Sequence, residues 1–205
     1  MLESSWTRCW TFIGASGTGR ALMRQLLDAY QAPPRKYHTV QHLTECLTLC
    51  NDYMHCAQAP GEVEIALWFH DAVYDVKATD NEERSAAWAM HELQHAGVHP
   101  ACIARVKEHI LATRHAALPQ GQDQALLVDI DLAILGAQAE RFKEYETQIR
   151  AEYSDVPRVL FRRKRRQILE GFLARSPIYA TPALQQRFEE RARQNMARAL
   201  AWLGG

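Results

Sequence analysis

The sequence lacks a long apolar run, an excess of charge of either sign, and closely paired cysteines. No apolar stretch approaches the roughly 18 residues that a membrane-spanning helix needs. The 24 basic and 24 acidic residues balance, so nothing in the net charge favours nucleic acid or an anionic membrane. The five cysteines form no C-x-x-C pair, which argues against a disulfide framework or a cysteine-based zinc site. Without a basic start followed by a long apolar segment, we expect a cytoplasmic protein with no nucleic-acid or membrane partner.

The chain also has almost no alternation of period two, which argues against β-strands, and it has no internal repeat or low-complexity linker. Apolar residues recur instead at spacings of three and four, as Val40, Leu43 and Leu47 do, and this pattern is typical of a buried helix face. We expect an all-α fold, a bundle of about nine helices. They are predicted around residues 22–27, 40–54, 60–74, 80–97, 100–110, 124–136, 142–153, 168–173 and 182–200.

One glycine-rich segment, "GASGTGRA", has the glycine spacing of a phosphate-binding P-loop. The lysine and the serine or threonine that bind phosphate and magnesium in that motif are replaced by Arg20 and Ala21. No parallel sheet is predicted to carry such a loop. We therefore interpret the segment as a lead-in to a helix, with Ser16 or Thr18 as the helix cap.

Histidine and aspartate side chains gather in four segments with apolar flanks. They are "RKYHTVQHL" with His38 and His42, "ALWFHDAVYD" with His70 and Asp71, "LLVDIDLAIL" with Asp129 and Asp131, and "ILATRHAA" with His115. A buried carboxylate costs several kcal/mol unless it is paired or bound to metal. Taken together, imidazole and carboxylate groups on separate helices predict a site for one divalent ion: Mn, Fe, Co, Zn or Mg.

This order of motifs resembles the HD superfamily of metal-dependent phosphohydrolases, which is named after an adjacent His-Asp pair such as His70-Asp71. The segments "RKYHTVQHL", "WFHDAVYD", "DNEERSA", "DIDLAILG" and "FLARSPIY" resemble a small bacterial group of predicted HD phosphohydrolases. The resemblance implies one HD-type helical domain over residues 1–205, with a helical C-terminal extension from about residue 137. It also implies hydrolysis of a nucleotide or another small phosphate ester.

The resemblance further implies roles for individual residues. The metal would be bound by His42, His70, Asp71 and Asp131. The segments "YHTVQH" and "IDLAI" are also similar, more distantly, to cyclic nucleotide phosphodiesterases. That likeness implies that His38 protonates the leaving group, and it implies the ligand roles of His42 and Asp131. His115 and Glu82 would position water or phosphate. Arg35 and Arg165 would contact the substrate phosphate. A second ion could be held by Asp75, Glu82 or His115.

Two other readings stay open at this point. The domain could bind metal or nucleotide without catalysis, or it could be a di-iron oxygenase of the HD type. The basic run from Arg162 to Arg166 is typical of a solvated helix face, apart from Arg165. His109 precedes the apolar pair Ile110 and Leu111, and the sequence assigns it neither to the surface nor to a site.

Overall fold

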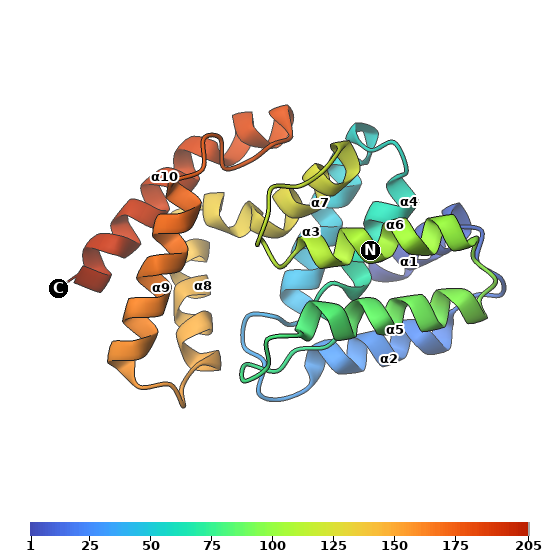
Figure 1. Cartoon of the computed structure of the whole chain (residues 1–205), viewed down its shortest axis with the longest axis horizontal. Coiled ribbons are helices and arrows are strands. Elements are labelled where there is room, and N and C mark those ends of the chain that lie inside the picture. Colours follow the sequence, from blue (N-terminus) through green and yellow to red (C-terminus); the bar gives the residue numbers. More distant parts are fainter. Residues whose placement is uncertain (205) are drawn as a thin grey trace. The chain divides into compact units, whose positions relative to one another are not determined.

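The chain folds entirely into helices, as the apolar spacing predicts (Figure 1). The structure is a computed structural model that describes residues 1–204, and no β-strand occurs among them. The elements are α1 (Leu2–Phe12), α2 (Arg20–Gln31), α3 (Val40–Tyr53), η1 (Met54–Cys56), α4 (Pro60–Phe69), α5 (Asn81–His95), α6 (Pro100–Ala112), α7 (Gln122–Asp131), η2 (Leu132–Gly136), α8 (Ala139–Glu152), α9 (Arg158–Leu173) and α10 (Pro182–Gly204). They form two compact units, Met1–Ile130 and the residues from Asp131 onward.

The first unit is built around α4, which packs against α1, α3, α5 and α6. Every residue of α4 from Gly61 to Phe69 is buried. A helix that is buried on all sides belongs inside a core, and the two acidic residues of α4, Glu62 and Glu64, are paired there with Arg105 and Arg8. Because α4 ends at Phe69, His70 and Asp71 follow directly after this buried helix.

The described residues contain ten α-helices, and α1 is the one that lies outside the nine predicted ranges. Its buried Trp6, Cys9 and Trp10 lie three and four residues apart, so the helical spacing is present but short. Trp6 stacks on Trp10 and meets Trp68 of α4 edge-on, at centroid distances of 5.0 and 5.2 Å. These aromatic contacts fix α1 against the core of the first unit.

The glycine-rich segment connects α1 to α2 and follows no strand, as expected from the all-α prediction. The predicted cap is wrong, because α2 begins after Gly19 with no side-chain cap, and the Ser16 hydroxyl donates to the Ala96 carbonyl instead. Gly19 has a φ of 59°, and a Cβ there would lie 2.8 Å from the Trp10 ring. Position 19 therefore requires glycine, because a side chain there would clash with α1.

In the second unit, α10 packs along η2 and α9, and α8 packs against η2. Leu184, Phe188, Ala192 and Met196 form the buried face of α10 at the predicted helical spacing. The Tyr179 hydroxyl donates to the Leu132 carbonyl at 3.0 Å, which ties the segment before α10 to η2.

None of the described helices combines the length and the apolar character that crossing a membrane requires.

Candidate metal centre

The first ligand-bearing segment leads into α3. Thr39 is the N-cap, and its hydroxyl accepts from the Gln41 amide, so the helix begins just after His38 and carries His42 in its first turn. The His42 ring is 2% exposed, and its Nδ1 lies 3.0 Å from the hydroxyl of the buried Tyr37. Tyr37 thereby orients the ring and leaves Nε2 facing the interior.

The second segment is the end of α4. Nδ1 of His70 donates to the Leu67 carbonyl at 2.7 Å, so the neutral ring carries its proton on Nδ1 and presents a lone pair on Nε2. Nε2 of His70 lies 3.2 Å from Nε2 of His42. A carbonyl or hydroxyl behind each imidazole is the arrangement that fixes metal-binding histidines in one tautomer.

Asp71 completes a triangle of donor atoms. Its Oδ2 lies 3.1 Å from Nε2 of His70 and 3.5 Å from Nε2 of His42. Three atoms at these separations can all lie about 2.1 Å from a single point, which is the usual distance from nitrogen or oxygen to a metal ion. The two histidines and Asp71 therefore fit one face of a coordination shell.

Asp131 lies close to the two histidines, in a group of possible ligands that does not include Asp71. It is the last residue of α7, a helix whose preceding residues belong to the first unit. Ligand atoms of His42, Cys46, His70 and Asp131 all lie within 4.8 Å of one another, so these residues could hold a metal ion. Asp129 is fully buried but lies outside this group.

Cys46 is absent from the predicted ligands, which are imidazoles and carboxylates only, although the structure places it in the group. It lies one helical turn after His42 on α3, a spacing that places both side chains on one face. Its Sγ is 3.7 Å from Nδ1 and 3.8 Å from Nε2 of His42. Because these two distances are nearly equal, the sulfur lies beside the ring and not beyond Nε2, where an ion held by His42 would be. In this side-chain conformation, Cys46 borders the group rather than pointing at its centre.

The electrostatics of the group keep Asp71 ionised. Burial opposes the charge, but His70, His38 and His42 together lower the pKa of the Asp71 carboxyl well below its usual range. An ionised carboxylate beside two imidazole lone pairs is a donor set with affinity for a divalent cation.

Arg35 ties the two ligand-bearing segments together. Its guanidinium donates to the carbonyls of His38 at 3.0 Å, Asp71 at 2.6 Å and Ala72 at 2.9 Å. It is 9% exposed and lies over the rings of Tyr30 and Tyr74. The structure thus gives Arg35 three backbone partners, and its contact with a substrate phosphate stays a prediction.

His38 lies at the edge of the group. It precedes α3, is half-buried, and stacks on Tyr74 with ring centroids 4.2 Å apart. Its ring centroid is 6.0 Å from that of His42, and its charge influences Asp71. This position is next to the donor atoms and outside their triangle.

Glu82 of α5 lies near Asp71 and near His115, which belongs to the loop after α6. Burial raises the pKa of Glu82, the carboxylate of Asp71 adds to that shift, and His115 opposes it. Glu82 therefore lies within electrostatic reach of both residues. His115 adopts a left-handed backbone with a φ of 54°, which turns the chain sharply at the end of α6.

Arg165 belongs to the second unit, where it is 6% exposed. Its guanidinium forms an ion pair with Glu146 and lies over the Tyr145 ring. Its neighbours Arg163 and Lys164 are exposed, as expected for a solvated helix face. The phosphate contact assigned to Arg165 stays a prediction.

Comparisons of the chain with protein-family models, curated proteins and solved structures give no match.

Proposed function

We propose that the chain is a metal-dependent phosphohydrolase of the HD type, acting on a nucleotide or another small phosphate ester. The donor atoms of His42, His70 and Asp71 can share one point, and Asp131 lies within 4.8 Å of both histidines. This arrangement carries the proposal. The motif order that resembles HD phosphohydrolases supports it.

A bound divalent ion would supply an acidified water and offset charge on the phosphoryl oxygens. His38, half-buried beside the donor triangle, is suited to protonate the leaving oxygen, because an imidazole exchanges protons near neutral pH. Glu82 of α5 and His115 of the loop after α6 would orient the water or the phosphate.

The test begins with protein purified without chelators, its metal content measured by elemental analysis. Wild type and Asp71→Asn are then assayed for phosphate release from alkyl and aryl phosphates and from mono-, di- and cyclic nucleotides. Bound metal with turnover in wild type, and loss of both in Asp71→Asn, would support a phosphohydrolase.

Two other outcomes point elsewhere. Bound metal without turnover on any phosphate ester would make the domain a binding module. Two irons per chain with consumption of oxygen would make it an oxygenase.

A further inference from the structure

The last turns of α5 carry two exposed histidines, His91 and His95, in the segment "HELQH". This H-E-x-x-H spacing puts both imidazoles on one face of the helix. Their ring centroids are 4.2 Å apart. Two imidazoles that share one ion, each with its nitrogen about 2.1 Å from it, have centroids about 4.5–5 Å apart. A small rotation of the side chains therefore gives the geometry that a single ion requires.

The two rings have the same nitrogen left for a ligand. Nδ1 of His95 donates to the His91 carbonyl at 2.8 Å, and Nδ1 of His91 donates to the Glu92 carboxylate at 3.3 Å. With the proton on Nδ1, the lone pair of each neutral ring is on Nε2, which has no hydrogen-bond partner among residues 1–204. An oxygen behind each imidazole is the arrangement that fixes metal-binding histidines in one tautomer.

The end of α5 is held in place by the glycine-rich segment. The carbonyl of Ala96, directly after His95, accepts from the amide and from the hydroxyl of Ser16, both at 2.8 Å. On the other side of the helix, Leu93 is fully buried. Glu92 and His95 border a cavity of about 400 Å³ between α5 and the start of α2, which leaves room for the water ligands of an ion.

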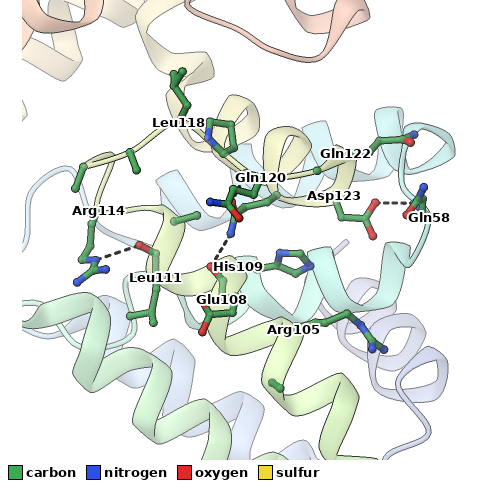
Figure 2. Close-up of a pocket in the computed structure, with 17 residues that line it drawn as sticks. Gln58, Arg105, Glu108, His109, Leu111, Arg114, Leu118, Gln120, Gln122 and Asp123 are labelled. Atoms are coloured by element: carbon green, nitrogen blue, oxygen red, sulfur yellow. Dashed lines mark hydrogen bonds between the residues drawn. The ribbon is translucent and has the colours of Figure 1, made fainter.

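Two other histidines of the first unit lack this combination of exposure and a lone pair. His99, the N-cap of α6, accepts from the Ala101 amide through Nδ1, so its neutral ring has no second lone pair to offer. His109 lies in the wall of a cavity beside α6 and α7 (Figure 2), where both ring nitrogens are buried without a hydrogen-bond partner among residues 1–204. By contrast, the side chain of His91 is 66% exposed.

We propose that His91 and His95 form a second metal site, for a divalent transition-metal ion such as Zn²⁺ or Cu²⁺. Imidazole nitrogens favour these ions over Mg²⁺ and Ca²⁺, which prefer oxygen ligands. Among residues 1–204, no third imidazole, thiol or carboxylate forms a group with this pair within 4.8 Å, so water completes the coordination shell. Catalytic zinc sites have three protein ligands, and we therefore assign binding and not catalysis to this pair. The site shares no residue with the candidate metal centre and does not depend on the proposed phosphohydrolase.

Calorimetric titration of the full chain with Zn²⁺ tests this proposal. The parent protein is His70→Ala, in which the candidate metal centre lacks a ligand, so that the remaining affinity reports the site on α5. We expect one Zn²⁺ per chain with a dissociation constant below about 1 mM, tighter binding of Cu²⁺, and no competition by Mg²⁺. Adding His91→Ala or His95→Ala should weaken Zn²⁺ binding about tenfold or more, because the second imidazole then no longer binds within the same chain. His99→Ala, at an exposed histidine near the pair, is the matched control and should bind like the parent.

A spectroscopic measurement on wild type keeps the test valid if His70→Ala does not fold. In protein labelled with 15N-histidine, the ring signals that are absent from His91→Ala and from His95→Ala should shift together as Zn²⁺ is added, and those of His99 should not. The proposal is overturned if Zn²⁺ does not saturate the site, if His91→Ala or His95→Ala binds as tightly as the parent, or if His99→Ala loses as much affinity as they do. Displacement of Zn²⁺ by an equal concentration of Mg²⁺ would also overturn it.

Discussion

Replacement of Arg35 by methionine tests whether this residue holds the candidate metal centre together. The substitution keeps a long apolar stem but removes the three hydrogen bonds to the carbonyls of His38, Asp71 and Ala72. A hydrogen bond from a charged donor contributes about 1.5–3 kcal/mol. The three bonds share one guanidinium and are not additive, so we expect a loss of about 3–5 kcal/mol in the free energy of unfolding.

The metal affinity should fall as well, because the same bonds set the spacing between the segments that carry His42 and His70. Loss of such supporting partners commonly weakens metal binding about 10- to 100-fold. The two effects are measured by urea denaturation of the metal-free protein and by competition with a chromophoric chelator. Lys36→Met, at the exposed neighbouring position, is the control, and Arg35→Lys should lie between wild type and Arg35→Met. Unchanged stability and metal affinity in Arg35→Met, together with weaker binding of inorganic phosphate, would refute this reasoning and favour the phosphate contact.

Four other substitutions have expected outcomes. His70→Ala should abolish metal retention at nearly unchanged helical content, whereas Cys46→Ala should retain the metal, because its sulfur lies beside the His42 ring; equal loss in elemental analysis would make the thiolate a ligand. His38→Ala should keep its metal but lose turnover by a factor of about 10² to 10⁴, and more on an alkyl than on an aryl phosphate; a small and equal loss on both would remove His38 from the mechanism. Because burial lowers the pKa of His109 below the 6.5 of an unfolded histidine, the unfolded chain binds a proton more readily, and the free energy of unfolding should fall as the pH drops below about 6.5. Urea melts at pH 7.5 and 5.5 should show a smaller fall in His109→Phe, and an equal fall would assign the pH dependence to other groups.

The helices were largely predictable because their signal is local. Helical spacing shows which face of a helix is buried, whatever that face packs against. Examples are Val40, Leu43 and Leu47 in α3, and Leu184 and Phe188 in α10. In α1, the same signal spans little more than one turn. Its burial depends on Trp68, which is 58 or more residues away along the chain, and local periodicity carries no information about such a contact.

The residue types of the candidate metal centre could also be predicted from the sequence, because imidazoles and carboxylates with apolar flanks need a partner or an ion. Their distances could not. The 3.2 Å between Nε2 of His42 and Nε2 of His70 depends on how α3 packs against α4. The hydrogen bonds that Arg35 donates to three carbonyls depend on the turn after α4. The sequence by itself therefore determined an all-α chain and the chemical character of its polar groups. Only the tertiary structure decided that Nε2 of His42 meets Nε2 of His70 and that His109 is buried without a hydrogen-bond partner among residues 1–204, because side chains on separate helices meet through packing and not through their order along the chain.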